Sequence, residues 1–340
     1  MEFNLNKMIR PHLVGVKSYE TLRDSYVDQE VTFLDANENP FGEFNRYPQG
    51  NPIKLKEKLA EINNAKTENL FLGNGSDELI DLAMRIFCEP AKDFILIMNP
   101  SFVMYEIYAK MNNVNVEKLD LNSDFQLEKV SFLKSVSNSK AKVLFLCSPN
   151  NPTGNSIDDL EFYIRNFYGI VVIDEAYIEF SPNESAVSLL QQYPNLIVFK
   201  TLSKAYGMAG LRVGIGFASP EIASLFLQFK PPYNISSESQ RLALEQLNQV
   251  EKIENNIKYI LYEKKKLEEG LAQINHIVKI YPSDANFFLV EFKDAELVYY
   301  SLLKAKILTS LRHPTMKNCL RISVGTMEEN LKLINILSQL

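Results

Sequence analysis

The sequence predicts an α/β protein with a mostly parallel sheet flanked by helices, followed by a smaller α/β unit. Apolar runs typical of buried strands alternate with helical patterns between residues 94 and 173, as expected for a parallel sheet. The 340 residues exceed a usual single domain, and a nearly continuous helical pattern over 236–273 suits a connection to a second unit. We therefore expect an arm over 1–35, a large domain over 36–250 and a small domain over 251–340.

In the first part of the large domain, the elements follow from apolar spacing. Leu55, Leu59 and Ile62 recur at helical intervals among lysines and glutamates, so 52–64 is expected to be an amphipathic helix. Further helices are expected from about 77, after Pro100 and near 158–165. Buried strands are expected at 94–98, 114–119, 143–147, 170–173, 197–199 and 213–218.

The small domain shows the same alternation of patterns. Strands are expected near 276–281, 286–292, 306–310 and 319–324, with helices near 294–304 and at the carboxyl terminus. The arm ends in LDANENPFG, whose Asn, Pro and Gly residues indicate a loop.

Composition excludes several classes of protein. A hydrophobic content of 46% with 23% charged residues is typical of a globular protein with an ample core. The net charge of -6 lacks the excess of positive charge that is typical of proteins that bind nucleic acid or an anionic membrane. The three cysteines and three histidines are scattered, so we expect neither a disulfide framework nor a metal site.

The amino terminus lacks the apolar core of a signal peptide, and no apolar run approaches the length of a membrane span. We therefore expect a soluble, cytoplasmic protein that binds neither nucleic acid nor membrane.

One lysine has unusual neighbours. The apolar run 197–199 stops at Thr201 and Ser203, which places Lys204 just beyond the carboxyl end of a predicted strand. A lysine that attacks a carbonyl needs a partly desolvated, cation-rich setting that lowers its pKa, and Arg212 offers such a charge. Arg212 is equally suited to grip a phosphate together with the two hydroxyls. The alternative is a solvated loop lysine beside an ordinary surface arginine.

The run S-K-x-x-G-x-x-G-x-R, from Ser203 to Arg212, resembles the pyridoxal-phosphate lysine signature of the class I and II aminotransferase family. That cofactor needs an imine-forming lysine, a phosphate cup and an anion at its pyridine nitrogen. It also needs a hydrogen bond to its phenolic oxygen and a group that stacks on its ring. The sequence contains a candidate for each.

The phosphate cup is expected at GNGSDE. Gly75, Ser76 and Asp77 stand where a strand turns into a helix, so free backbone N–H groups and the helix dipole would face an anion. The motif half-resembles a dinucleotide fingerprint, but Glu78 replaces its third glycine. The alternative is a simple helix start capped by Ser76.

The ring contacts are expected at two strand ends. Asp174 ends the strand VVID, and a carboxylate there would keep a pyridine nitrogen protonated. Tyr177 and the Asn151 amide, from the rigid loop SPNNPTG, are candidates for the phenolic oxygen. The alternative for Asp174 is a turn-forming or capping aspartate, and the alternative for the loop SPNNPTG is an ordinary Asn-Pro turn.

Two further side chains complete the candidate site. Tyr105 of PSFVMY follows another strand end and is expected to stack on the ring, although an aromatic at helical spacing is more often core. Arg321 lies within a small-domain strand, where a buried arginine requires an anion such as a carboxylate or phosphate of the substrate. A structural ion pair is the alternative.

The resemblance extends over nearly the whole chain. GNGSDE, PSFVMY, SPNNPTG, DEAY, SKAYGMAGLR and LRISVGT occur in the order found in fold-type I aminotransferases, which implies that fold. The forms LDANENPFG, RYPQG, GNGSDE and PSFVMY most resemble the histidinol-phosphate branch. This branch implies transfer of an amino group between histidinol phosphate and 2-oxoglutarate, or imidazole acetol phosphate and glutamate, in histidine biosynthesis by a homodimer with shared sites. Alternatives on this scaffold are an aromatic amino acid aminotransferase and a threonine-phosphate decarboxylase.

The resemblance also assigns roles to residues. Lys204 would bind the cofactor covalently and move the substrate proton, while Asp174, Asn151 and Tyr177 would tune the ring. The phosphate would be held by Gly75, Ser76, Asp77, Thr201, Ser203 and Arg212, and by Tyr47 of RYPQG across the dimer interface. Arg321 would bind either substrate anion, and Arg312 and Tyr19 resemble additional phosphate contacts of the histidinol-phosphate branch. A non-catalytic cofactor-binding module and a plain scaffold are the remaining hypotheses.

Overall fold

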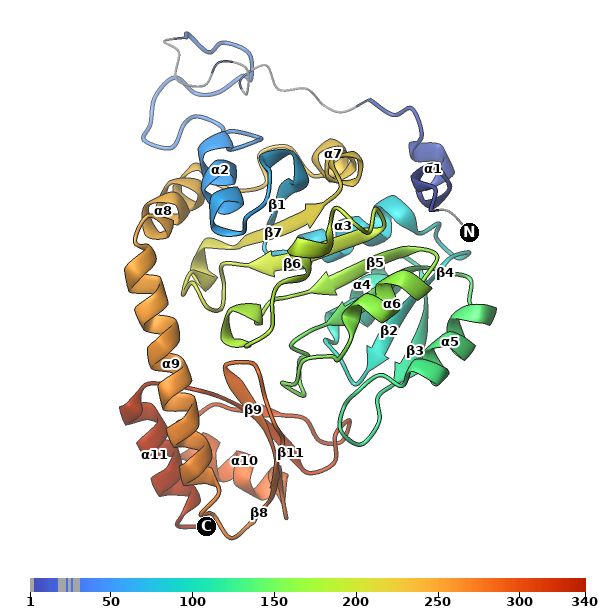
Figure 1. Cartoon of the computed structure of the whole chain (residues 1–340). Helices are drawn as coiled ribbons and strands as arrows, with labels where there is room; N and C mark the ends of the chain where they lie inside the picture. The colour runs from blue at the N-terminus through green and yellow to red at the C-terminus, as the bar shows by residue number, and fades with distance from the viewer. Residues whose placement is uncertain (1–2, 18–22, 24–25, 27–30) are drawn as a thin grey trace.

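The computed structural model describes residues 3–17, 23, 26 and 31–340. Its main body is a seven-stranded sheet with the strand order β1-β7-β6-β5-β4-β2-β3 (Figure 1). The strands are β1 (Leu70–Asn74), β2 (Phe94–Asn99), β3 (Asn115–Asp120), β4 (Ala141–Cys147), β5 (Ile170–Asp174), β6 (Leu196–Thr201) and β7 (Val213–Ala218).

The predicted mostly parallel sheet is confirmed, with one exception in direction. β6 pairs in parallel with β5, whereas β7 pairs antiparallel with both β6 and β1. The other strands therefore all end at one edge of the sheet. This arrangement brings the residues that follow Asn74, Asn99, Cys147, Asp174 and Thr201 close together.

Helices cover this sheet. They are α1 (Leu5–Met8), α2 (Ile53–Ile62), α3 (Ser76–Phe87), α4 (Met104–Met111), α5 (Lys129–Asn138), α6 (Leu160–Asn166) and α7 (Pro220–Phe229), and short 3-10 turns lie at Pro11–Leu13, Thr67–Asn69, Ile178–Phe180, Ala186–Leu189 and Ala209–Leu211. α3 packs on β1, β6 and β7. The sequence patterns did not predict α5 or α7. In α5 Val130 is exposed and serines interrupt the apolar face. The segment of α7 is short and mostly apolar, and such a run is hard to distinguish from a buried strand.

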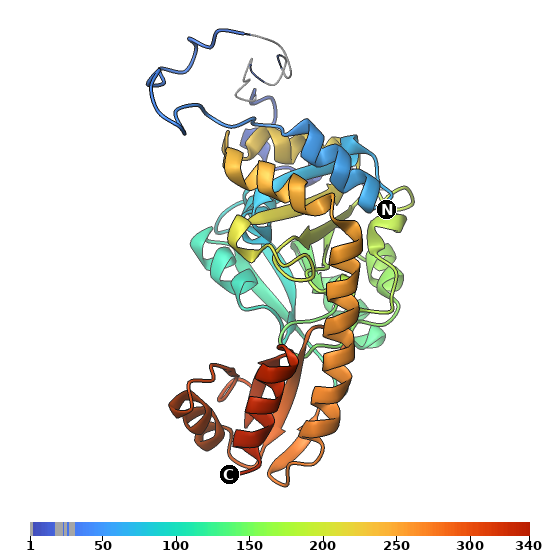
Figure 2. The same cartoon turned by 90° about the vertical axis from the view of Figure 1, so that its left-hand side faces the viewer.

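The long helical pattern over 236–273 forms two helices rather than one. α8 (Ser237–Leu247) ends where Leu247 is fully buried in the main core, and α9 (Val250–Leu271) then runs away from that core (Figure 2). The chain turns at Gln249, whose ψ of 51° is not helical. No glycine or proline marks this break, so the pattern of apolar residues did not reveal it.

The carboxyl-terminal unit has its own sheet and core. β8 (Ile277–Ile280), β9 (Phe287–Phe292), β10 (Ser310–Leu311) and β11 (Cys319–Ser323) form an antiparallel sheet in the order β10-β11-β9-β8, covered by α10 (Ala295–Lys304) and α11 (Met327–Leu337). The strand predicted at 306–310 begins later than expected, at Ser310 of β10. Lys306 adopts a positive φ of 60°, which is incompatible with an extended strand at that residue. We retain a domain boundary near residue 250 as a proposal, since side chains of α9 pack against both units.

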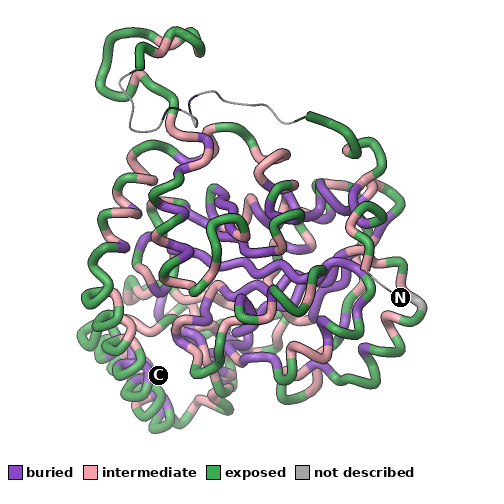
Figure 3. The backbone as a smooth tube through the Cα atoms, turned by 45° about the horizontal axis from the view of Figure 1, so that its top comes forward, coloured by how far each residue is buried: buried purple, intermediate pink, exposed green. Residues whose placement is uncertain are grey.

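Burial follows this architecture. Apart from the edge strand β3, the strands of the main sheet are buried along most of their length. Residues 31–47, by contrast, form a projecting segment that is largely exposed (Figure 3). Among the residues that the structure describes, no helix combines the length and apolar composition needed to cross a membrane.

Candidate active site

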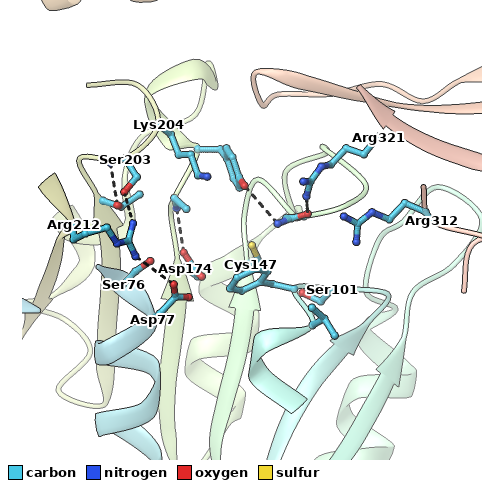
Figure 4. Close-up of a pocket in the computed structure, with 16 residues that line it drawn as sticks. Ser76, Asp77, Ser101, Cys147, Asp174, Ser203, Lys204, Arg212, Arg312 and Arg321 are labelled. Atoms are coloured by element: carbon cyan, nitrogen blue, oxygen red, sulfur yellow. Dashed lines mark hydrogen bonds and ion pairs between the residues drawn. The ribbon is translucent and has the colours of Figure 1, made fainter. Parts of the chain in front are cut away.

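A cavity of about 240 Å³ lies at the edge where the parallel strands end. Side chains from both units line it, with Arg212 on one side and Arg312 and Arg321 on the other (Figure 4). Eleven residues named from the sequence take part: Ser76, Asp77, Asn151, Asp174, Tyr177, Thr201, Ser203, Lys204, Arg212, Arg312 and Arg321. The topology of the sheet explains why residues so far apart in the chain meet here.

The residues expected to form a phosphate cup lie together at the start of α3. The Gly75 N–H donates to the Arg212 carbonyl at 2.8 Å, which holds the turn against the arginine. The Arg212 guanidinium lies 3.5 Å from the Asp77 carboxylate and donates to the Ser203 hydroxyl, also at 3.5 Å. Helix N–H groups, a guanidinium and a hydroxyl therefore surround one point, which suits a phosphate dianion.

Glycines allow this close approach. Gly75 has a φ of 76°, and a Cβ there would lie 2.4 Å from a guanidinium nitrogen of Arg212. A Cβ at Gly214 of β7 would lie 2.3 Å from the Gly75 carbonyl carbon. Both positions therefore require glycine for the cup to form.

Replacing Gly75 by alanine should weaken binding of pyridoxal phosphate roughly tenfold or more, because the backbone conformation and the new methyl group together cost about 1–3 kcal/mol. Titration of the cofactor-free protein by absorbance would measure this. Gly210→Ala is the matched control, since nothing lies within 4 Å of a Cβ at that position. Equal affinity of both variants would contradict the predicted role of Gly75.

A buried carboxylate lies deeper in the cavity. Asp174, the last residue of β5, accepts a hydrogen bond from the Tyr105 hydroxyl at 2.7 Å and one from the Ala176 N–H at 3.2 Å. Burial raises the pKa of Asp174 to about 6, although these hydrogen bonds oppose the shift. The site therefore holds an acid that a bound cation would strongly favour in its ionised form.

The structure corrects the expectation for Tyr105. Its ring is fully buried and stacks on Phe145 at 4.9 Å, so it lies beneath the cavity and holds Asp174 instead of offering a face to a ligand. Phe102 and Val103 of the same motif line the cavity. Tyr105 belongs to the first turn of α4, where its side chain points into the core, whereas Phe102 precedes the helix. The motif PSFVMY contains two aromatics, and spacing alone did not separate them.

The loop after β4 links the two units. The Asn151 amide donates to the Tyr177 hydroxyl at 3.4 Å, and its carbonyl oxygen accepts a hydrogen bond from Arg321. Burial raises the pKa of Tyr177, so this hydroxyl keeps its proton and can donate it to a ligand oxygen. The predicted grouping of Asn151 and Tyr177 at one point is thus present in the structure.

Lys204 lies between the two cationic sides of the cavity (Figure 4). Its ammonium nitrogen is 5.7 Å from the centre of the Tyr177 ring. The residue is exposed toward the cavity, but partial desolvation, followed by the positive charges of Arg321 and Arg212, lowers the pKa of its amine. This is the environment in which a lysine becomes a nucleophile near neutral pH.

The small unit contributes two arginines. Arg321 lies in β11, and Arg312 immediately follows β10, which pairs with β11. The Nε of Arg312 is buried without a hydrogen-bond partner among the described residues, and burial lowers the pKa of this side chain. Two neighbouring guanidinium groups with spare donors suit an anionic substrate.

Some predicted residues lie elsewhere. Tyr47 is outside the cavity and stacks on Tyr233 at 4.7 Å, and Tyr19 lies outside the described residues. The sequence reasoning also missed cavity residues that carried no individual signal: Ser101, Phe102, Val103, Cys147 and Ala176. Four of them lie inside the predicted motifs PSFVMY and DEAY, and Cys147 directly precedes SPNNPTG. The motifs therefore located the segments better than the single side chains.

Comparisons with known proteins identify the family and the fold. The family model for aminotransferases of class I and II matches residues 18–337. A histidinol-phosphate aminotransferase of Flavobacterium psychrophilum is 45% identical over 345 residues, which cover 99% of each chain. The crystal structure of a histidinol-phosphate aminotransferase from Clostridium acetobutylicum has a TM-score of 0.79 and 27% identity, and covers 87% of this chain and 90% of its own. The fold is also that of the Sinorhizobium meliloti enzyme in complex with pyridoxal-5'-phosphate, with a TM-score of 0.80 at 21% identity over 86% and 82% of the two chains.

Proposed function

The chain belongs to the class I and II aminotransferase family, and we propose that it transfers an amino group between histidinol phosphate and 2-oxoglutarate with pyridoxal phosphate as cofactor. The observation that carries this proposal is the cavity in which Lys204 lies between a phosphate cup and a pair of arginines. The near full-length similarity to relatives named histidinol-phosphate aminotransferase supports the choice of substrate and a role in histidine biosynthesis.

The residues present fit the cofactor. The cup around Arg212, which a Cβ at Gly75 would fill, suits its phosphate, and Asp174 suits its protonated ring nitrogen. Tyr177 and Asn151 would meet its phenolic oxygen, and Phe102 is better placed than Tyr105 to cover the ring. When bound, pyridoxal phosphate supplies an aldehyde that reacts with amines and a ring that accepts the electron pair left at the substrate carbon.

Lys204 would perform two tasks. Its amine, with its pKa lowered, would bind the cofactor covalently until a substrate amine replaces it, and would then remove and return the proton at the substrate carbon. Asp174 would remain ionised beside the positive ring and stabilise charge in the transition state. Water has limited access to Asp174, because this side chain is almost completely buried where it lines the cavity.

Two substrates must use the site in turn, and both carry an anion. Arg321 would pair with the phosphate of histidinol phosphate or with a carboxylate of 2-oxoglutarate, since a guanidinium fork fits both. Arg312, with its unsatisfied Nε, would add a second contact to the phosphate.

A homodimer and a cytoplasmic location are parts of the same proposal. Tyr47 would reach a cofactor phosphate in a second copy, which agrees with its exposure outside its own cavity. The three cysteines are buried and unpaired, as is usual in a reducing compartment.

The test is a spectrum of the purified, cofactor-saturated protein before and after addition of histidinol phosphate. We expect an aldehyde-type band to convert to an amine-type band, and 2-oxoglutarate to reverse the change. With 2-oxoglutarate present, histidinol phosphate should exceed phenylalanine in kcat/KM at least roughly tenfold, since phenylalanine lacks a phosphate. Faster turnover of phenylalanine, or release of carbon dioxide from threonine phosphate, would favour the alternative enzymes of this scaffold.

A further inference from the structure

The segment over residues 31–47 holds its shape without a hydrophobic core. Phe41 and Phe44 are 82% and 72% exposed, and the segment projects from the body beside α2 (Figures 1 and 3). Among the described residues, burial of these apolar side chains therefore contributes little to its conformation. Polar contacts and ring contacts supply its order instead.

One carboxylate gathers those contacts. Glu38 accepts hydrogen bonds from Arg23 at 2.6 and 2.8 Å, from Arg46 at 2.7 Å and from the backbone N–H of Tyr47 at 2.6 Å. Its side chain is only 4% exposed, although the surrounding segment is open to solvent. Hydrogen bonding from Arg23 lowers the pKa of Glu38 to about 2, so the group is ionised in the neutral range.

Arg23 extends the network to the start of the segment. Its guanidinium also donates to Asp35, at 2.7 Å from Nη2, and lies 4.8 Å from the centre of the Phe33 ring. Charge-assisted contacts of this kind are short and directional, so they define a loop more narrowly than solvent-exposed apolar groups can.

We propose that Glu38 is the positioning residue for Tyr47. The carboxylate fixes the Tyr47 backbone, and stacking on Tyr233 at 4.7 Å and 18° orients its ring, so the hydroxyl is presented in one direction. The inference rests on the proposed function, in which Tyr47 contacts the cofactor phosphate of a second copy. The inference assigns a role to the motif LDANENPFG, because its glutamate, Glu38, fixes the position of a residue that contacts the cofactor phosphate of the second copy.

The experiment compares the dissociation constant of pyridoxal phosphate in the proposed homodimer of the whole 340-residue chain for Glu38→Gln, Tyr47→Phe and the double variant. We expect each single variant to weaken binding about tenfold, the value of one hydrogen bond to a charged group, and the double variant to be no worse than either. Glu43→Gln removes the same charge from an exposed position of the same segment and should leave the affinity unchanged. Glutamine keeps the shape of Glu38 but cannot pair as an anion with two arginines.

The outcomes separate the inference from the proposed function. The role of Glu38 would be overturned if Glu38→Gln bound the cofactor normally while Tyr47→Phe bound it more weakly. It would also be overturned if the two losses of cofactor affinity were additive in the double variant. No loss in Tyr47→Phe would instead refute the shared site. If Glu38→Gln dissociates the dimer, the Arg46→Gln variant provides the test, because it removes one hydrogen-bond partner of Glu38 and leaves Arg23 in place. We expect this variant to remain a dimer and to lose less cofactor affinity than Glu38→Gln. Unchanged cofactor affinity in Arg46→Gln would contradict the inference.

Discussion

Replacement of Lys204 by alanine should lower the rate of amino-group transfer roughly 10⁴-fold or more, because in the proposed mechanism this one side chain supplies both the nucleophile and the proton carrier. The variant should still bind pyridoxal phosphate, since the cup and Asp174 remain. Treatment with borohydride followed by mass spectrometry distinguishes the two forms. The native protein should gain the cofactor on the peptide that contains Lys204, and the variant should not.

Lys204→Arg is the matched control for charge. It retains a cation beside the Tyr177 ring, but a guanidinium does not lose its proton near neutral pH and cannot act as the amine. We therefore expect Lys204→Arg to be as inactive as the alanine variant. Substantial turnover in either variant would show that another group performs the chemistry.

Much of the fold could be predicted because its signals are local. The apolar runs that became β2, β4, β5 and β6 are bounded by polar segments, and helices such as α2 have a clear amphipathic period. The direction of β7 could not be predicted, because a strand buried on both faces has the same apolar pattern whether it runs parallel or antiparallel to its neighbours. The break between α8 and α9 depends on which core each helix buries its side chains against, and that is decided by tertiary structure.

The site was predictable where topology constrains it. Asp174, Thr201 and Lys204 each lie at or just after a strand end, so a parallel sheet brings them together regardless of what separates them in the chain. Tyr105 was predicted wrongly because its direction depends on where α4 begins, which the sequence did not define to within a residue. The role that we propose for Tyr47 lies between two chains, and the sequence pattern of a single chain contains no information on such a contact.

Asp174→Asn should have opposite effects on stability and on activity. In the absence of cofactor, burial raises the pKa of this carboxyl from 3.8 to about 6. The folded protein therefore binds the proton more tightly than the unfolded chain, so the contribution of Asp174 to stability is present below about pH 4 and is lost as the pH rises through 6. At pH 8 the cofactor-free asparagine variant should unfold at the same temperature as the native protein or higher. That difference should shrink as the pH falls from 6 toward 4.

Activity should change in the other direction, with a loss of roughly 10³-fold in kcat, because the variant lacks the anion that we propose to face the ring nitrogen of the cofactor in the transition state. Asp158→Asn, at an exposed position, controls for the loss of a charge and should alter neither quantity. A carboxylate kept only for structure would give a variant that is less stable and nearly as active at pH 8. Retained stability together with lost activity is expected only if the buried charge of Asp174 serves a positively charged ligand. Thermal unfolding and turnover, measured on the same samples, would distinguish this role from a purely structural one.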